Sequence, residues 1–388
     1  MGKRANGEGT LYYQEAHNRW VGQYTVNSKR RTLYAKTQGE ARKKLTQALH
    51  EIDNGTYTDN ALTVGQWLKT WLAEYVKVHR KPKTYQWYES IVREHLLPAW
   101  QKKKLRDLEF HDVQTLLNEK IKSGLATNTV LGIKRTLQAA LSRALKNRLV
   151  AYNAAHGAEV AKNVKVKERR ILTLEEQSAL LRASRNEDRG LMIEFALFTG
   201  LRAGEFLGLR WCDIDMDAKT FTVKQTVQRL KQEDGASRLM FGTPKTQKGA
   251  RTVPLLEGLA DKLLKHKMKQ AETRELAGSA WEDNDLVFSS NIGTAIDPRN
   301  FQRFLSKVVD KAGIPHVNTH ALRRSFSTRA RENGMELEVL SNILGHSDVR
   351  LTLNTYTGVS TERTKKEMQK LDALLKKGGR KGLCLLRR

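Results

Sequence analysis

The 388-residue sequence predicts a mostly helical α+β protein with three parts: a small three-stranded N-terminal sheet plus helix, a helical bundle, and a mainly helical C-terminal domain with a small antiparallel sheet. Three observations predict this fold class. Short strand-like runs separated by turn-forming residues come first. Apolar residues then recur at helical spacing along most of the remaining chain. Capping-box sequences, which open helices, occur at Thr37, Thr63 and Thr173.

Residues 1–60 are expected to form a separate N-terminal domain. Strand-like runs cover 10–13, 19–24 and 31–35, and a helix should follow the capping box at Thr37 and cover one face of the sheet. Basic residues decorate the strands and turns, namely Arg19, Lys29, Arg30 and Arg31. They fit either a basic face that enters a DNA groove or an ordinary solvated surface, and the sequence leaves both open.

Residues 63–153 predict an all-helical bundle, with helices near 84–97, 110–122 and 128–147 after the one that opens at Thr63. In the last of these an apolar stripe runs from Val130 to Ala144, and the candidate DNA contacts Lys134 and Arg135 lie off it. Three tryptophans fit either the core of the bundle or platforms on which bases stack, and their helical spacing favours the core, namely Trp67, Trp71 and Trp87.

Residues 154–170 lose this periodicity and predict a basic linker that lies along a phosphate backbone, with Lys165, Lys167 and Arg169 as candidate contacts. The last domain follows at 171–376, where the alternation from Thr220 to Val227 predicts a strand. Residues 377–388 form a basic tail.

The charge balance indicates a polyanionic partner. Lys and Arg number 69 against 42 Asp and Glu, which gives a formal net charge of +27 and favours double-stranded DNA. An anionic membrane is the alternative, but the cations are spread along the chain, and no transmembrane segment or signal peptide is evident. Two cysteines cannot build a disulfide framework or a zinc site. We therefore expect a cytoplasmic protein that needs no metal and no cofactor.

Five separated fragments carry residues suited to phosphodiester chemistry, and they contain Arg202, Lys245, His320 with Arg323, His346 and Tyr356. Guanidinium groups pair with phosphate oxygens bidentately and keep their charge. His320 and Arg323 are three residues apart on a helix predicted to begin at Thr319, so they share a face. Tyr356 is the candidate nucleophile once its phenol loses its proton.

Lys245 is the candidate general acid. It lies in a turn predicted between strands near 239–241 and 251–255, where a lysine at a hairpin tip reaches a departing 5′-oxygen. Lys248 and Arg251 are the competing candidates. The acidic run Asp213–Asp217 is either a metal-binding cluster or a polar turn after Trp211, and the absence of His or Glu around it favours the turn.

In this order the five fragments resemble the catalytic set of the tyrosine recombinases, the phage-integrase family, and are most similar to integrases of phages and conjugative transposons. The resemblance implies that Tyr356 forms a 3′-phosphotyrosyl link with DNA and that Lys245 is the general acid. Arg202, His320, Arg323 and His346 would stabilise the phosphate, and Glu205 would support the arginine site. Residues 1–60 would bind arm-type sites and residues 63–153 core-type sites.

The resemblance also implies an assembly and a biological setting. A homotetramer on DNA would exchange strands through a Holliday junction, without metal or ATP. An excisionase and a host DNA-bending protein would be its partners, and a bacterial nucleoid its location. The segment 360–376 would form a helix that packs either on its own domain or on a neighbouring subunit. Alternatives are a chromosome-dimer resolvase of the Xer type, a type IB topoisomerase and a non-catalytic architectural DNA-binding protein.

Overall fold

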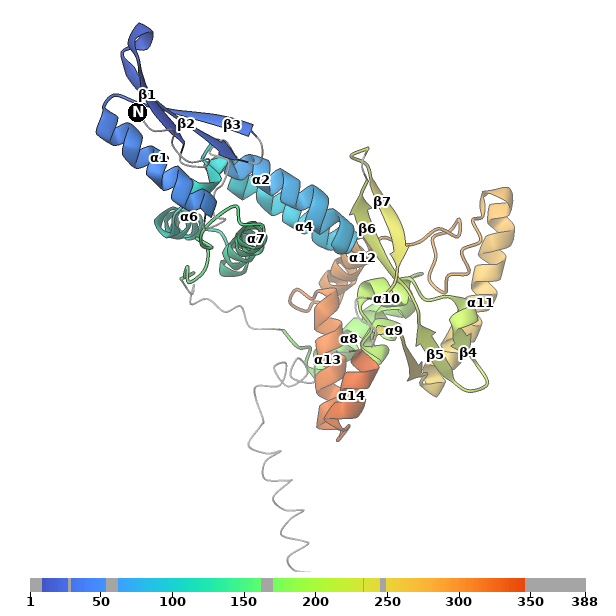
Figure 1. Cartoon of the computed structure of the whole chain (residues 1–388). Helices are drawn as coiled ribbons and strands as arrows, with labels where there is room; N and C mark the ends of the chain where they lie inside the picture. Colours follow the sequence, from blue (N-terminus) through green and yellow to red (C-terminus); the bar gives the residue numbers. More distant parts are fainter. Residues whose placement is uncertain are drawn as a thin grey trace, which may run out of the picture. The chain divides into compact units, whose positions relative to one another are not determined.

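The computed structural model describes residues 9–26, 29–53, 62–161, 170–232, 234–244 and 249–345 (Figure 1). The chain divides into two compact units, residues 1–166 and 167–388. Across the described residues the protein is mostly helical with small antiparallel sheets, which confirms the predicted fold class. None of the helices described there is long and apolar enough to cross a membrane.

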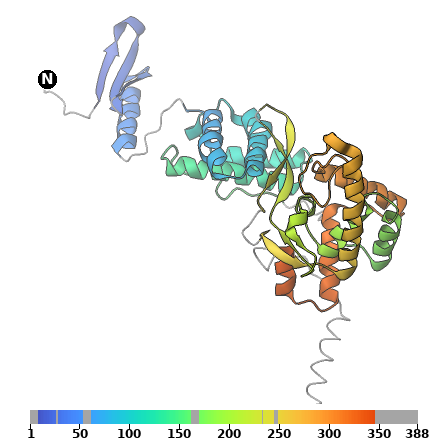
Figure 2. The ribbon, with the colours of Figure 1, turned by 90° about the vertical axis from the view of Figure 1, so that its right-hand side faces the viewer.

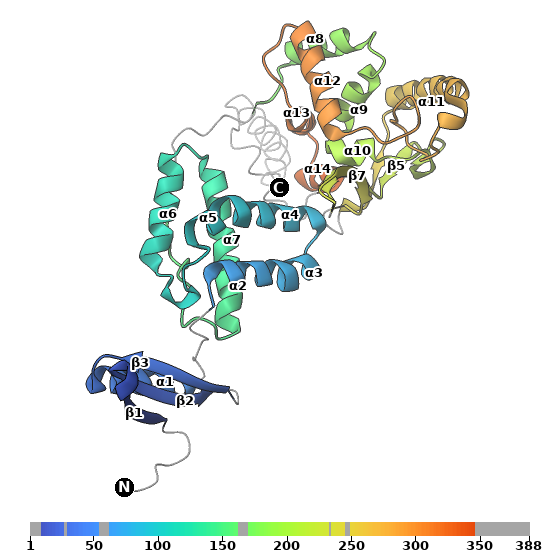
Figure 3. The ribbon, with the colours of Figure 1, turned by 90° about the horizontal axis from the view of Figure 1, so that it is seen from above.

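The first unit begins with a three-stranded antiparallel sheet of order β1-β2-β3, followed by a helix (Figure 3). The strands are β1 (Thr10–Gln14), β2 (Arg19–Val26) and β3 (Lys29–Ala35), and the helix is α1 (Gln38–Asp53). Thr37 opens α1 as predicted, because its hydroxyl oxygen accepts the backbone N–H of Glu40 at 3.3 Å. Tyr24 of the sheet packs with Leu45 and Ala48 of α1, so this helix covers one sheet face.

A helical bundle forms the rest of the first unit. Its helices are α2 (Val64–Thr70), α3 (Lys77–His79), α4 (Pro82–Ile91), α5 (Leu97–Trp100), α6 (Phe110–Lys122) and α7 (Thr127–Lys146), with π-helical turns at Trp71–Val76 and Val92–Leu96 and a 3-10 turn at Leu105–Asp107. The capping box at Thr63 is present, with reciprocal bonds to Gln66 of 3.2 and 2.9 Å. The predicted stripe of α7 is fully buried.

The prediction that three tryptophans lie in the core of the bundle is only partly confirmed. Trp67 and Trp71 are buried as predicted, and the Trp67 indole donates to the Ala140 carbonyl at 3.0 Å. Trp87 was expected in the core but is 44% exposed. Part of its ring lies against Gly132 of α7, where a Cβ would come within 2.7 Å of it, and the rest of the side chain is accessible to solvent.

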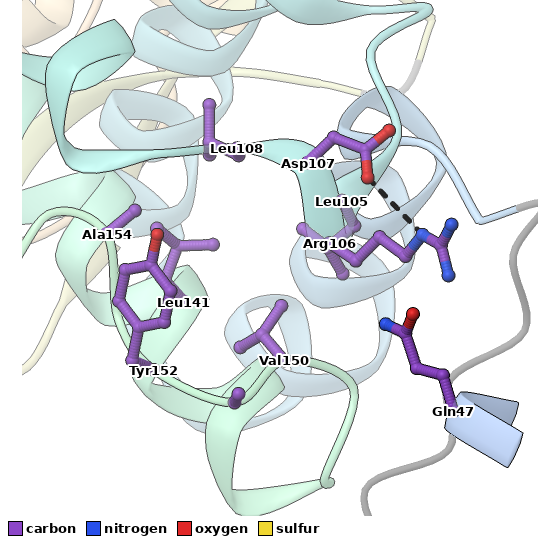
Figure 4. Close-up of a pocket in the computed structure, with 10 residues that line it drawn as sticks. Gln47, Leu105, Arg106, Asp107, Leu108, Leu141, Val150, Tyr152 and Ala154 are labelled. Carbon is purple, nitrogen blue, oxygen red and sulfur yellow. Dashed lines mark ion pairs between the residues drawn. The ribbon is translucent and has the colours of Figure 1, made fainter. Parts of the chain in front are cut away.

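A pocket of the first unit lies beside the 3-10 turn (Figure 4). Leu108, Leu141 and Val150 line it together with the ring of Tyr152, and an ion pair joins Arg106 to Asp107 at its edge. The pocket shares no residue with the candidate site described below.

The second unit is built on helices with two small sheets. The helices are α8 (Leu174–Ser184), α9 (Gly190–Thr199), α10 (Ala203–Leu207), α11 (Glu257–Ala277), α12 (Pro298–Lys311), α13 (Thr319–Glu332) and α14 (Leu337–Leu344), with 3-10 turns at Trp211–Asp213 and Gly278–Ala280. The strands are β4 (Ile214–Asp215), β5 (Thr220–Val223), β6 (Thr226–Lys231), β7 (Ser237–Gly242) and β8 (Arg251–Pro254).

The strand pairing corrects two expectations. The single strand predicted from Thr220 to Val227 is two strands, because β5 pairs with β4 and β8 while β6 pairs with β7. The predicted hairpin around Lys245 is wrong for the same reason, since β7 and β8 belong to different sheets. The segment from Thr243 to Ala250 is a connection between sheets, and residues 245–248 within it lie outside the described residues.

The core of the second unit places the ends of α9, α10, α13 and α14 near one another. Five phenylalanines are fully buried, namely Phe195, Phe206, Phe221, Phe288 and Phe301. Helix α13 packs against α9 and α14, and α14 also contacts β8. The helices α13 and α14 are the reddest ribbons of this unit in Figure 2.

Candidate active site

Arg202 and Glu205 form the start of α10. The chain leaves α9 at Gly200, with φ +63°, and turns into the N-cap residue Arg202. The Glu205 carboxylate accepts the Arg202 backbone N–H at 3.1 Å and its Nη1–H at 2.7 Å. An acid three residues into a helix satisfies a free backbone N–H and meets the positive end of the helix dipole. The Arg202 side chain stays 39% exposed while that of Glu205 is 5% exposed, so the guanidinium is anchored yet open.

Arg251, the first residue of β8, is the second partner of Glu205. Its Nη2 lies 3.1 Å from Glu205 Oε2, its Nε donates to the Ile343 carbonyl at 2.6 Å, and its Nη1 donates to the Gly249 carbonyl at 3.0 Å. The side chain is only 7% exposed. An arginine whose three nitrogens are all engaged, and which keeps its charge, does not fit the alternative role of general acid.

Arg323 of α13 is the third guanidinium at this carboxylate. Its Nη1 lies 4.0 Å from Glu205 Oε2 and donates to the Gly200 carbonyl at 2.9 Å, while its Nη2 donates to the Leu344 carbonyl at 2.7 Å. We call Glu205 with its three arginines, Arg202, Arg251 and Arg323, the Glu205 cluster. It joins α9, α10, α13, α14 and β8 at one point.

The cluster has more positive than negative charge. Burial raises the pKa of Glu205, but the charges of Arg251 and Arg202 outweigh it, so the pKa lies below its usual value. Glu205 is therefore ionised at neutral pH. Within the described part of the site, one carboxylate faces three guanidinium groups, so the four side chains of the cluster together carry a net charge of +2.

His320 adds a neutral hydrogen-bonding group. It lies in the first turn of α13, where the Asn318 side chain accepts the Ala321 N–H at 2.9 Å and fixes the start of the helix. The residue is exposed overall, yet desolvation of its ring, followed by the positive charges of Arg323, Arg324 and Arg202, lowers the pKa of His320 below its usual value. The imidazole is thus neutral at pH 7 and has one N–H with which it can donate a hydrogen bond.

The structure brings together four of the seven predicted catalytic residues, namely Arg202, Glu205, His320 and Arg323. Lys245, His346 and Tyr356 lie outside the described residues. Sequence reasoning did not predict that Arg251 pairs with Glu205, because nothing local distinguishes a buried arginine at a strand start from a solvated one.

The predicted DNA contacts of the N-terminal sheet do not share one face. Directly paired residues of adjacent strands project to the same side, so Arg31 lies on the face of Tyr24, which α1 covers. Lys29 alternates onto that face too, at the strand end. Arg30 and Arg19 lie on the open face, where the Arg19 guanidinium stacks 3.9 Å from the ring centroid of Tyr34.

Of the other predicted DNA contacts, the structure describes two and leaves three outside the described residues. Arg135 of α7 is exposed and Lys134 is half-buried. Lys165, Lys167 and Arg169 lie outside the described residues.

The acidic run near Trp211 is an ion-pair cluster. Asp213 lies 2.9 Å from both Arg210 Nε and Lys224 Nζ, and burial raises its pKa less than the bonds from these two cations lower it. Among the described residues no group of three His, Cys, Asp or Glu side chains is arranged to hold a metal ion. We call Asp213 with Arg210 and Lys224 the Asp213 cluster.

Comparison with known proteins identifies what the chain is similar to. The profile of the phage integrase family matches residues 170–363, and that of the phage integrase N-terminal SAM-like domain matches residues 63–121. A tyrosine recombinase XerC-like protein of Caldanaerobacter subterraneus is 28% identical over 359 residues, which cover 89% of this chain and 92% of the relative. An integrase of Streptomyces ambofaciens is 28% identical over 364 residues, covering 91% and 93%.

Solved structures show the same fold. The Tn1549 transposon integrase in complex with transposon right end DNA has a TM-score of 0.68 at 21% identity, covering 80% of this chain and all of that one. A lambda integrase tetramer bound to a Holliday junction has a TM-score of 0.54 at 18% identity, covering 92% of this chain and 99% of that one.

Proposed function

Because the chain belongs to the phage integrase family of tyrosine recombinases, which cleave and rejoin DNA at specific sites, we propose that the Glu205 cluster binds the scissile phosphodiester. One observation carries the proposal: three guanidinium groups surround one buried carboxylate, inside the segment that the family profile matches. A cluster of buried cations in excess is costly without an anion, and the pentacoordinate phosphate of strand cleavage is such an anion.

The residues of the cluster have separate roles in this proposal. Arg202 and Arg323 bind the two non-bridging oxygens, and neutral His320 donates a further hydrogen bond without adding charge. Glu205 touches no DNA and fixes the Arg202 guanidinium in place. Fixed donors of this kind stabilise charge that develops in the transition state and need no reorganisation.

The nucleophile and the general acid are proposed from the sequence motifs alone. The Tyr356 phenol oxygen attacks phosphorus, its proton passes to a neighbouring histidine or to the phosphate, and the bond from phosphorus to the 5′-oxygen breaks. Lys245 gives that oxygen its proton, and His346 stabilises the phosphate. The product is a 3′-phosphotyrosine and a free 5′-hydroxyl, so attack by another 5′-hydroxyl reverses the reaction with no external energy.

The proposed function also includes an assembly on DNA and a role for each part of the chain. We propose that four copies exchange strands through a Holliday junction, as the solved lambda integrase tetramer supports. The sheet of residues 1–60 binds arm-type sites, the bundle of 63–153 binds core-type sites, the linker 154–170 follows the backbone, and 171–376 catalyses, with a basic tail at 377–388. The element is a phage or a conjugative transposon, and an excisionase and a host DNA-bending protein set direction in the bacterial nucleoid.

Adduct formation on a nicked site tests this function. A site is first selected from random duplexes by binding to the full chain, then nicked near the cleavage position so that religation fails. Incubation without magnesium should give a denaturant-resistant protein–DNA adduct, and Tyr356→Phe should form none while keeping nearly the same DNA affinity. An adduct in Tyr356→Phe refutes the nucleophile, and tight binding without any adduct by the native chain favours the architectural alternative.

The resolvase alternative has one observation in its favour, the similarity to an XerC-like recombinase. Recombination between two short identical core sites, with no arm-type DNA, would support it. A requirement for arm-type DNA and for residues 1–60 would support the integrase.

A further inference from the structure

We propose that Arg251 is a positioning residue that keeps Arg202 and Arg323 available to the scissile phosphate by occupying the second oxygen of Glu205. The inference rests on the proposed function of the Glu205 cluster. In this role Arg251 is buried and contributes to strand cleavage without touching DNA.

Each oxygen of Glu205 accepts from a different arginine side chain, and Oε2 also accepts the Arg202 backbone N–H at 3.1 Å. Oε1 accepts from the Arg202 Nη1 at 2.7 Å. Oε2 accepts from the Arg251 Nη2 at 3.1 Å, while the Nη1 of Arg323 is farther away at 4.0 Å. Without Arg251, the Nη1 of Arg323, at 4.0 Å, would be close enough to pair with Oε2. A full ion pair between them would draw Arg323 away from a phosphate and cancel its charge.

Backbone contacts hold Arg251 in this position. Its Nε and Nη1 donate to the carbonyls of Ile343 and Gly249. The Ile343 carbonyl is one of the last four of α14, which have no partner inside the helix and carry the negative end of its dipole. These contacts aim the remaining Nη2 at Glu205 and account for the almost complete burial of the side chain.

Gly345, the residue that follows α14, lies directly against the same guanidinium. Gly345 has φ +65°, and a Cβ built on it would lie 2.7 Å from the Arg251 Nη1. Only a residue without a side chain fits there in that backbone conformation. Gly345 therefore leaves room for Arg251, and a methyl group at this position would displace the guanidinium without changing any charge.

Lysine at position 251 separates the charge of Arg251 from its geometry. An ammonium group keeps the positive charge near Glu205, but as a single nitrogen it cannot reproduce three N–H groups directed at three different elements. Arg251→Lys should therefore leave Glu205 free to approach Arg323. A shift of about 1 Å in a positioned group costs about 10²-fold in reaction rate, and we expect a loss of this size for Arg251→Lys.

The test measures single-turnover adduct formation by the full chain on nicked site DNA with two linkages, the natural phosphodiester and a neutral methylphosphonate at the scissile position. Arg251→Lys should slow adduct formation on the phosphodiester by about 10²-fold, with little change in the dissociation constant for DNA. The defect should shrink on the methylphosphonate, because that linkage has lost an anionic oxygen that displaced guanidinium groups fail to neutralise.

Two further variants keep the test falsifiable if Arg251→Lys unfolds. Gly345→Ala should show the same pattern, and Gly313→Ala is its control, since Gly313 has φ +66° but open space around its Cβ position. Arg210→Lys is the control for the loss of an arginine fork beside a buried carboxylate, and it should react like the native chain on both linkages.

The outcomes separate the inference from the proposed function. If the native chain forms no adduct, the proposed function fails. If it does, and Arg251→Lys reacts at the native rate, or if folded Arg251→Lys and Gly345→Ala lose the same factor on both linkages, Arg251 has only a structural role.

Discussion

Two ion-pair clusters of the second unit begin with the same local pattern and differ in everything around it. Arg202 and Arg210 are each the residue before a short helical turn, and each pairs with an acid three residues later, at 2.7 and 2.9 Å. Both carboxylates, Glu205 and Asp213, are almost fully buried and have lowered pKa values. The sequence alone makes them look alike.

The second cation distinguishes them. At Asp213 the second cation is Lys224, whose side chain is 55% exposed. The negative charge of Asp285 also acts on Arg210 and contributes to its raised pKa. At Glu205 the second cation is Arg251, whose side chain is 7% exposed, and a third cation, Arg323, is 8% exposed. Charge is balanced and solvated in the first cluster, and in excess and buried in the second. The comparison teaches that an anion site arises from tertiary packing around a local motif.

Removal of each acid should give the largest difference in stability between the two clusters. Glu205→Gln leaves Arg251 and Arg323 buried without a counter-charge, so we expect it to lower the free energy of unfolding by about 3–5 kcal/mol. Asp213→Asn should cost about 1–2 kcal/mol, because Arg210 and Lys224 can turn toward water. Urea unfolding of both variants measures the difference, and equal losses would show that the two clusters are equivalent.

Substitution of a glycine that adjoins the Glu205 cluster should have the next largest effect on stability. Gly200 has φ +63°, its carbonyl accepts from Arg323, and a Cβ there would lie 2.3 Å from the Phe326 ring. Gly200→Ala should therefore lower the free energy of unfolding by about 1–3 kcal/mol. Gly313→Ala shares the positive φ but meets no atom, so about 1 kcal/mol is expected. A loss at Gly313 as large as that at Gly200 would mean that backbone strain, with no contribution from packing, decides both.

Two histidines provide the smallest and most local comparison. Desolvation lowers the pKa of both His320 and His266, but of the two only His320 lies beside arginines of the Glu205 cluster, whereas the ring of His266 lies 6.2 Å from that of Trp211. A phosphate at the cluster offsets the guanidinium charges, so site DNA should raise the pKa of His320 and leave that of His266 unchanged. Histidine NMR titration of Tyr356→Phe with and without DNA measures both, and an unmoved His320 would place the phosphate elsewhere.

The same shift has a consequence for stability against pH. His320 has a folded pKa below its unfolded value of 6.5, so its contribution to stability is complete above pH 6.5 and is lost as pH falls through the folded pKa. Glu205 follows the same sign below its unfolded value of 4.5. In the unbound protein, His320→Gln should therefore flatten the decline of the unfolding free energy just below pH 6.5, and an unchanged slope would contradict the shift.

Local sequence patterns predicted much of the fold because the information for it is local. The helix at 110–122 has the predicted bounds, and the capping boxes at Thr63 and Thr173 form with the predicted partners. Strand pairing was missed because it is not local. The alternation from Thr220 to Val227 continues across Lys224 and Gln225, where the chain passes from one sheet to another.

The candidate site was predictable only as a set of residue types. The spacing of His320 and Arg323 placed both on one helix face, and the structure has them there. The role of Arg251 required the packing of β8 against α14, which no spacing encodes. The exposed Trp87 shows the same limit, since a helical stripe does not tell how much of a large ring other side chains cover.

The rate of adduct formation by two matched variants tests most directly that the Glu205 cluster binds the scissile phosphate. Arg202→Ala and Arg210→Ala each remove one helix-capping arginine that is 39% and 35% exposed, so both should fold. On the nicked site, Arg202→Ala should lower the single-turnover rate constant by about 10²–10³-fold, the loss typical of one charge-stabilising donor. Arg210→Ala should stay within about threefold of the native chain, under 1 kcal/mol of activation free energy. Equal losses, or a larger loss for Arg210→Ala, would contradict the placement of the phosphate at Glu205.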